Sequence, residues 1–515
     1  MGGRYIVGID LGTSGCKSLL MDERGAVVRT ALEEYPLAAP KPGWYEQDPA
    51  QWWDAVKRTL RRLTDGLDGA RDIRSIGLSG QMHGLVALGQ GGEVLRPCMI
   101  WADSRNAEQV GEVYERVGGV GALLELTNNR MLASYTGGKI LWMRKNEPGV
   151  YEKTRIAFNP KDYIRYRLTG ECATDVSDAS GTGLFDVRNR RWSEQLLRIL
   201  DIPRAILPKA WESNDVAGQL VRGVAEDTGL PAGIPVVAGG GDAVVQATGT
   251  GLVHEGVLGI TIGTGGIVST ALESCRPNPE GKLQVFCMNS AGTWHAMGVS
   301  LTVGGALKWL KDACGYGQSE ASRLAGEDVY DSICREAETV EPGSEGLLFL
   351  PHLVGSRCPF DDAKARGAFV GFTLRHERRH MFRALMESCV MSLRDIAEIF
   401  AAMGIPWRQL RTSGGASKGR LWRQLQADAF DTDVVTVSGA SHGGAYGAAL
   451  IAGSGTGAWR SLKEAAEVLE VQTHETPIAR NVERYGRLLS IYQGLYPALR
   501  ETFHRIADEY LTKGE

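Results

Sequence analysis

The sequence lacks the features of a nucleic-acid-binding, disulfide-rich or zinc-ribbon protein. It carries 57 Lys and Arg against 61 Asp and Glu, for a formal net charge of −4 at pH 7. A near-neutral balance gives no reason to expect nucleic acid or an anionic membrane as a partner. The nine cysteines include no C-x-x-C pair and follow no regular spacing, which favours reduced thiols over a disulfide framework.

Long hydrophobic runs are also missing. No apolar stretch approaches the length that spans a membrane, and the N-terminus passes into a strand-like segment without a signal-peptide core. Low-complexity tails are absent too. We therefore expect a soluble, cytoplasmic protein.

The composition that is present indicates an ordinary globular protein of more than one domain. The chain has 515 residues, of which 43% are hydrophobic and 23% charged. Strand-like apolar runs alternate with helical periodicity, which predicts an α/β fold. A boundary near residues 247–258 divides the chain into a domain of residues 1–250 and a domain of residues 251–515.

One short pattern occurs twice. Residues 8–14 (GIDLGTS) and residues 259–265 (GITIGTG) each follow an apolar run and precede a second strand-like segment. Each copy predicts a strand, a tight Gly-Thr turn and another strand. Glycine in such a turn lets a phosphate approach the backbone amides, and threonine adds a hydroxyl donor.

The two copies differ at one informative position. The first has a carboxylate, Asp10, where the second has Thr261. Only the first half therefore offers a hard oxygen ligand suited to Mg²⁺. The pattern predicts an ATP-using enzyme with a cleft between two related domains.

Polar segments follow several predicted strands. They are residues 80–84 (GQMHG), residues 101–105 (WADSR) and residues 239–242 (GGGD). Open α/β sheets bind ligands just beyond the ends of their strands, so these segments are candidate substrate loops. A long helix is expected over residues 381–403, ended by Gly404 and Pro406, and a Gly- and Ala-rich helix over residues 443–453.

These stretches together resemble the FGGY family of carbohydrate kinases, which belongs to the actin-like, ribonuclease-H-like ATPase superfamily. The resemblance covers nearly the whole chain, and residues 81–84 and 101–105 are most similar to those of xylulokinases. The matching segments are residues 10–13 (DLGT), 43–49 (GWYEQDP), 239–242 (GGGD), 262–266 (IGTGG), 365–367 (ARG) and 413–416 (SGGA).

The resemblance implies transfer of a phosphoryl group from MgATP to the terminal hydroxyl of a ketopentose, D-xylulose in the first place. It implies two ribonuclease-H-like domains flanking a nucleotide and sugar cleft. A small sugar and ATP are then the partners, without nucleic acid or membrane, and a homodimer is possible within the family.

The resemblance also assigns roles to individual residues. Asp242 is the base that accepts the hydroxyl proton, and Asp10 is the catalytic ligand of Mg²⁺. His83 is expected to donate a hydrogen bond to a sugar hydroxyl. The remaining expected sugar contacts are Gln81, Met82, Trp101 and Asp103, and the expected ATP contacts are Gly12, Thr13, Ser14, Lys17, Gly263, Thr264, Gly265, Gly414, Gly415 and Ala416.

Each assigned residue also has a purely structural interpretation. Asp242 could form an Asx turn, Asp10 and Asp103 could cap turns, and residues 414–416 could be a loop before a helix. A single histidine is more often structural than functional, and Trp101 could belong to the core. The chain departs from the family pattern at Ala102, at Ser356 and in residues 441–446.

Alternative functions remain open at this point. Residues 376–380 (HERRH) match the H-E-x-x-H zinc-protease signature, although two arginines beside the site would oppose a cation. An actin- or chaperone-like ATPase would share both Gly-Thr turns but would not need the loops around His83 and Asp103. Within the kinases, ribulose, gluconate and polyols are the other candidate substrates.

Overall fold

The computed structural model describes residues 4–67, 70–314 and 316–510. The chain forms two compact units, and each is assembled from separate stretches of sequence. The first contains the described parts of Met1–His254 with Ala271–Ala296 and His442–Glu470. The second contains Glu255–Thr270 and the described parts of Met297–Ser441 and Val471–Glu515.

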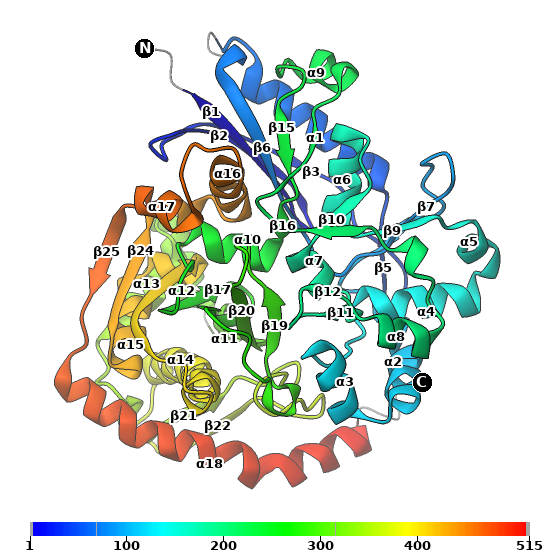
Figure 1. Ribbon diagram of the computed structural model, residues 1–515. Coiled ribbons are helices and arrows are strands. Elements are labelled where there is room, and N and C mark those ends of the chain that lie inside the picture. Colours follow the sequence, from blue (N-terminus) through cyan, green and yellow to red (C-terminus); the bar gives the residue numbers. More distant parts are fainter. Residues whose placement is uncertain (1–3, 68–69, 315, 511–515) are drawn as a thin grey trace. The chain divides into compact units, whose positions relative to one another are not determined.

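The first unit is built on a mixed sheet with the strand order β14-β15-β6-β1-β2-β3 (Figure 1). Strand β1 pairs with β2 antiparallel and with β6 parallel. The strands are β1 (Tyr5–Leu11), β2 (Gly15–Asp22), β3 (Val27–Glu34), β6 (Ile73–Gly80), β14 (Val216–Gln219) and β15 (Pro235–Val237).

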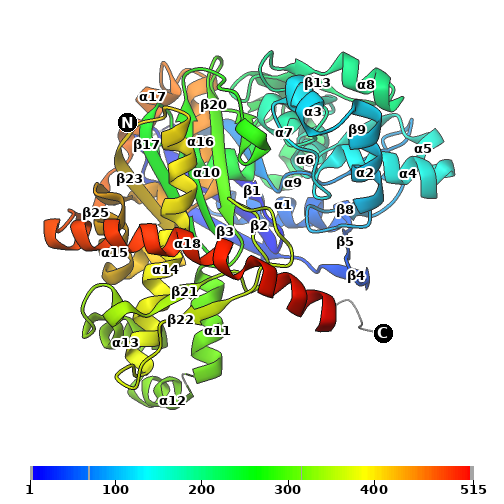
Figure 2. The same ribbon diagram turned by 90° about the horizontal axis from the view of Figure 1, so that it is seen from below.

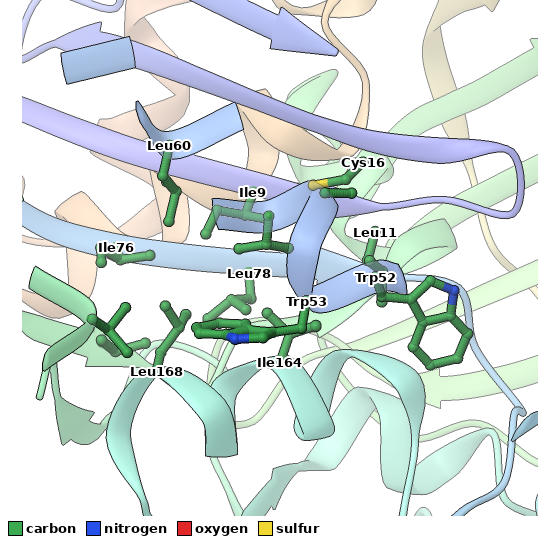
Figure 3. Packing of buried hydrophobic residues seen from close by; sticks show 14 of the residues in the cluster. Ile9, Leu11, Cys16, Trp52, Trp53, Leu60, Ile76, Leu78, Ile164 and Leu168 are labelled. Carbon is green, nitrogen blue, oxygen red and sulfur yellow. The ribbon is translucent and has the colours of Figure 1, made fainter. Parts of the chain in front are cut away.

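Helix α1 (Pro49–Thr64) covers one face of this sheet with α6 (Pro160–Thr169). It begins where the sequence predicts, because Asp48 accepts a hydrogen bond from the Ala50 amide (2.9 Å) and proline occupies the first turn. Its apolar side packs in the core shown in Figure 3, where labelled members are Ile9, Leu11, Trp52, Trp53, Leu60, Ile76, Leu78, Ile164 and Leu168.

The opposite face carries α16 (Gly444–Gly455), which packs on β1 and β6 although it is far away in sequence (Figure 1). Two strand glycines allow this close approach. A Cβ atom on Gly8 or Gly77 would lie 1.9 Å from the carbonyl oxygen of Ala445 or Ala448, respectively. Any larger residue at either strand position would push the helix off the sheet.

The second unit repeats the sheet of the first. Its strands follow the order β20-β18-β17-β23-β24-β25. Strand β17 pairs with β18 antiparallel and with β23 parallel, as β1 pairs with β2 and β6. The predicted duplication is therefore confirmed at the level of sheet topology. The strands are β17 (Gly256–Ile262), β18 (Gly266–Leu272), β20 (Trp294–Ser300), β23 (Trp407–Gly414), β24 (Asp433–Val437) and β25 (Val471–Glu475).

Helices α11 (Gly304–Cys314), α14 (Arg378–Ala402), α15 (Arg420–Phe430) and the C-terminal α18 (Ala479–Tyr510) belong to the second unit. The long helix predicted for residues 381–403 is α14, which begins three residues earlier. Helix α18 contacts both α14 and α15, and Figure 2 shows its course past them.

All nine cysteines lie in described segments, and none forms a disulfide. Across residues 4–67, 70–314 and 316–510, no helix combines the length and the apolar character that crossing a bilayer requires.

Candidate active site

Asp10 lies near the end of the central strand β1 in the first unit, between two neighbouring strands. Its register partners are Lys17 on β2 and Ser79 on β6. The Ser79 hydroxyl donates to Asp10 Oδ1 at 2.6 Å. Burial raises the pKa of the Asp10 carboxyl, and the Ser79 hydrogen bond and Lys17 offset this only in part. A cation bound to this carboxylate would stabilise its charged form.

Asp242 is the first residue of α10 (Asp242–Gly249), directly after the glycine triplet. Its Oδ1 accepts a hydrogen bond from the Ala243 amide at 2.8 Å, a contact with the next residue and not the i+2 contact of an Asx turn. Burial, and then the negative charge of Asp10, raise the pKa of Asp242 to about 7. The charges of the two carboxylates therefore interact.

A buried hydrogen-bond chain holds the turn that precedes Asp242. The Gly241 amide donates to Ser177 Oγ at 3.0 Å, and Ser177 Oγ donates to Asp175 Oδ2 at 2.5 Å. Asp175 also caps the short helix α7 (Val176–Ser180) through the Ser177 amide. The position of the Asp242 main chain therefore depends on a serine hydroxyl.

Lys161 supports the same turn from inside the protein. Its buried ammonium donates to the Ala238 carbonyl oxygen at 3.1 Å and lies 2.7 Å from Asp162 and 3.1 Å from Asp175. Burial alone lowers the pKa of Lys161, but Asp162, Asp175 and Asp178 outweigh it and raise the pKa above its usual value. Sequence reasoning missed Lys161 and Ser177, since nothing local distinguishes a buried lysine from one on a wet helix face.

Replacing Ser177 by alanine is expected to lower kcat about tenfold, because the buried Gly241 amide loses its acceptor, at a cost of about 1–3 kcal/mol. The KM for ATP should change little. Ser213→Ala is the matched control, since Ser213 Oγ donates to the same Asp175 oxygen (2.8 Å) without contacting Gly241. Steady-state kinetics of both variants provide the measurement, and an equal loss in both would contradict the role of Ser177.

Met82 lies beside the turn that precedes Asp242, and His83 follows it in the chain. A Cβ on Gly241 would lie 2.6 Å from the Met82 Cγ and Sδ atoms, so Met82 packs directly on that glycine. His83 Nδ1 is 2.6 Å from the Gly181 carbonyl oxygen, which can only accept, so Nδ1 carries the proton. In the neutral ring Nε2 is then an acceptor, whereas in the protonated ring it is a donor, so the expected hydrogen bond to a sugar hydroxyl stays a prediction.

Gln81 is fully buried and faces the first Gly-Thr turn. Its amide nitrogen donates to Gln47 Oε1 at 2.8 Å, and Gln47 in turn donates to the Thr13 carbonyl oxygen at 2.7 Å. The Gln81 main-chain amide donates to the Leu11 carbonyl oxygen at 2.8 Å. These contacts connect Gln81 with the turn and with none of the other expected sugar residues.

Trp101 and Asp103 have very different surroundings. Trp101 is 47% exposed, which excludes the core interpretation, and its indole nitrogen donates to Thr13 Oγ1 at 2.8 Å. Asp103 is buried, and both of its oxygens accept hydrogen bonds from Arg105 while Oδ2 also accepts one from the Tyr45 amide. Arg105 is held by a second carboxylate, Glu46, at 2.8 Å. A sugar hydroxyl would therefore have to displace Arg105 or the Tyr45 amide to reach the Asp103 oxygens.

The first Gly-Thr turn is closed by its own backbone. The Gly12 amide donates to the Gly15 carbonyl oxygen at 3.0 Å, so this amide is already engaged. Thr13 and Ser14 at the tip are half-buried and exposed, respectively. Lys17 is half-buried beside Asp10, where burial lowers the pKa of its ammonium and Asp10 raises it in part.

The second turn is also closed by its own backbone but is one residue shorter, since β17 and β18 pair Ile262 with Gly266 whereas β1 and β2 pair Leu11 with Cys16. The Gly263 amide donates to the Gly265 carbonyl oxygen at 2.9 Å, and the Gly305 amide at the start of α11 donates to the Thr264 carbonyl oxygen at 2.9 Å. The exposed tip is formed by Gly263 and Thr264. Both turns are thus rigid hairpins.

Strand β23 ends at Gly414 next to this turn, as its pairing with β17 brings Gly414 opposite Ile262. Gly414 has φ 84°, and a Cβ there would lie 2.3 Å from the Ile262 carbonyl oxygen. Gly415 and Ala416 follow in a short 3-10 helix, and a Cβ on Gly415 would meet nothing within 4 Å. The second unit therefore presents a hairpin tip and a glycine-lined strand end at one edge of its sheet.

The zinc-protease pattern does not form a metal site. His376 precedes α14, and its Nδ1 accepts from the Thr373 amide at 2.9 Å, whereas His380 Nδ1 caps the helix by accepting from the Glu377 amide at 3.0 Å. Within the described parts of the chain, no group of three or more His, Cys, Asp or Glu residues could hold a metal ion.

Two protein-family models match this chain. The model of the FGGY family of carbohydrate kinases, N-terminal domain, matches residues 5–249, and that of the C-terminal domain matches residues 258–456. The chain is 37% identical over 509 residues to the xylulose kinase of Lactococcus lactis subsp. lactis (strain IL1403), covering 98% of this chain and 99% of that protein.

Other relatives are similar over the full length. Identity to the xylulose kinase of Escherichia coli (strain K12) is 34% over 505 residues, covering 98% of this chain and 99% of that one. The structure of a xyloylose kinase from Brucella ovis matches with a TM-score of 0.87 at 33% identity, covering 97% of this chain and 100% of that one. A gluconate kinase from Lactobacillus acidophilus matches with a TM-score of 0.90 at 28% identity, covering 98% and 100%. The predicted α/β fold of two domains is confirmed, and the chain belongs to the FGGY family of carbohydrate kinases.

Proposed function

We propose that this kinase transfers the γ-phosphoryl group of MgATP to the terminal hydroxyl of D-xylulose, giving D-xylulose 5-phosphate. The observation that carries the proposal is the Asp242 carboxylate, whose pKa is raised to about 7 by burial and by Asp10, and which directly follows Gly241, the glycine on which Met82 packs. The names of the relatives with 33–37% identity point to the same substrate.

Asp242 is the proposed general base. A base with a pKa near the working pH accepts a hydroxyl proton effectively while remaining partly ionised. It takes the proton from the sugar hydroxyl as the oxygen attacks the γ-phosphorus, and the bond to the leaving ADP oxygen breaks. Phosphoryl transfer proceeds through a loose transition state, so the protein contributes mainly by positioning and charge stabilisation.

Asp10 is the proposed protein ligand on the Mg²⁺ side, through water. Magnesium usually keeps several waters and is held by one or two carboxylates together with substrate phosphates. The residues present fit this mode, because Asp10 places a partly exposed carboxylate near the end of β1 and the described chain offers no three-ligand cage. The ion would neutralise charge on the phosphates.

ATP is proposed to contact the hairpin tips at Thr13 and Ser14 in the first unit and at Thr264 and Gly265 in the second, with Lys17 as a further cation. Since the Gly12 and Gly263 amides close their own turns, the phosphate donors are expected among the amides that follow them. Gly414, Gly415 and Ala416 are proposed to accommodate the adenosine part. That both turns hold one nucleotide stays a prediction.

The sugar is proposed to contact Met82, the Nε2 atom of His83 and the exposed face of Trp101. Asp103 acts at one remove in this proposal, since its side chain holds Arg105. The Gln81 amide nitrogen donates to Gln47, whereas its buried Oε1 accepts no hydrogen bond and stays a proposed acceptor for a sugar hydroxyl. These hydrogen bonds hold the two candidate substrate loops, residues 80–84 and residues 101–105.

Gluconate is the second candidate substrate, because a Bacillus subtilis (strain 168) gluconokinase is 29% identical over 506 residues. Gluconate is an anion and needs a positive partner. Arg105, the cation within the 101–105 loop, is already paired with Asp103 and Glu46, which favours a neutral ketose.

An ADP-release assay over D-xylulose, L-xylulose, D-ribulose, L-ribulose, gluconate and glycerol tests the assignment. We expect kcat/KM for D-xylulose to exceed that for each other compound by about tenfold or more, since a missing or misplaced hydroxyl leaves buried polar groups unpaired. Turnover that no sugar raises above the sugar-free rate would overturn the proposal and favour an ATPase module.

Three further expectations remain proposals. The two FGGY domains are proposed to meet at residue 250, the protein is proposed to work in the cytoplasm, and a homodimer is possible.

A further inference from the structure

Lys139 is a fully buried lysine without an assigned role in the family chemistry described above. It lies near the start of α4 (Thr136–Asn146), where the helix dipole disfavours a cation. Burial lowers the pKa of its ammonium to about 7, with Cys98 and Asp103 opposing the shift. Burial and the helix N-terminus both disfavour a positive charge at Lys139. We therefore expect its role to lie in its hydrogen bonds.

Those contacts lead to the substrate loop. The ammonium donates to the His83 carbonyl oxygen at 2.8 Å and to the Ser134 carbonyl oxygen at 2.6 Å. His83 has φ 70°, in the left-handed region that a β-carbon disfavours. Lys139 therefore holds the main chain of the one loop residue whose backbone is strained.

The imidazole of His83 lies between Tyr135 and Gly181. Its ring stacks on the Tyr135 ring with centroids 4.6 Å apart and planes 30° apart. Its edge meets Gly181, where a Cβ would lie 2.8 Å from His83 Cε1 and Nδ1. Because Ser134 directly precedes Tyr135, the Lys139 ammonium joins the two main-chain segments that carry the stacked rings.

We propose that Lys139 is a positioning residue for sugar recognition, which fixes the main chain of His83, and with it the place of the imidazole, without touching the sugar. The inference rests on the proposed function, because it assumes that His83 contacts the sugar. The tautomer is set separately by the Gly181 carbonyl oxygen at Nδ1.

A double-mutant cycle on sugar binding tests the inference. The dissociation constant of D-xylulose is measured by calorimetry without nucleotide for the wild type, Lys139→Met, His83→Ala and the double variant. We expect Lys139→Met to weaken sugar binding about tenfold, with the KM for ATP unchanged, and to have no further effect in the His83→Ala background. Lys145→Met on the same helix is the matched control, since its ammonium is exposed and pairs with Glu108.

The outcomes distinguish the sugar role of His83 from the positioning role of Lys139. If His83→Ala binds the sugar as the wild type does, the sugar role of His83 is wrong. If His83→Ala weakens binding but Lys139→Met does not, or if the two effects simply add, the positioning role is overturned. Should Lys139→Met fail to fold, Lys139→Ala, which also removes the N–H donors, takes its place in the same cycle.

Discussion

Replacing Asp242 by asparagine is expected to lower kcat about 10²- to 10⁴-fold, the usual contribution of a positioned base. This corresponds to about 3–5 kcal/mol in the activation barrier. Asparagine has nearly the same shape but cannot accept the hydroxyl proton. Steady-state kinetics with D-xylulose give the measurement, and Asp227→Asn on the exposed surface is the control.

The thermal stability of the Asp242→Asn variant separates chemistry from folding. The folded-state pKa of Asp242 is raised to about 7 from 3.8, so ionising it costs stability as the pH rises between these values. Asparagine removes that cost, and we expect Tm at pH 8 to stay the same or rise. A large fall in Tm together with lost activity would point to a structural role.

The wild-type enzyme should show the same group in its pH profile. Because the base works only when ionised, kcat/KM is expected to rise with pH through an apparent pKa near 7 and then level off. In Asp242→Asn, the residual kcat/KM should not show this rise with pH, which is the acid limb of the profile.

Replacing Asp10 by asparagine is expected to lower kcat about 10²-fold or more, since a divalent ion contributes several kcal/mol of charge stabilisation in the transition state. The Mg²⁺ concentration for half-maximal activity should rise. Since Asp10 helps to raise the pKa of Asp242, the acid limb of the residual activity should move to lower pH.

Ser79→Ala is the matched variant for this test. It removes the hydrogen bond at 2.6 Å but retains the carboxylate, so most of kcat should remain. An acid limb at the same pH in wild type and Asp10→Asn would show that the two carboxylates do not interact. Unchanged Mg²⁺ dependence would contradict the metal role of Asp10.

Local sequence patterns predicted the elements that local chemistry determines. Both Gly-Thr turns join two antiparallel strands, the second with one residue fewer, because glycine and the flanking strand periodicity act within a few residues. Helix α1 starts at Pro49 because its cap and proline are adjacent in sequence. For the same reason the strand ends that carry Gly414 and Asp242 could be located in advance.

Tertiary structure decided how the polar groups pair. In their motifs Gln81 and Asp103 look like sugar ligands, and that stays a prediction. The structure shows that Asp103 holds Arg105 and that the Gln81 amide nitrogen donates to Gln47, while Gln81 Oε1 accepts no hydrogen bond. Trp101, which could have been core, is exposed and bonds to Thr13. A motif gives the residue type at a strand end but not which of its atoms the surrounding chain already uses.

The sequence by itself predicted the duplicated α/β architecture from periodicity and turn chemistry, and its motifs resemble the FGGY family, which the comparisons confirm. The roles of Asp10 and Asp242 follow from that resemblance and stay predictions. Only the folded chain decided that α16 returns to the first sheet, that Asp10 raises the pKa of Asp242, and that Lys139 and Lys161 are buried. Burial and charge pairing arise between residues far apart in the chain, and their energies depend on distance and local solvation rather than on sequence neighbours.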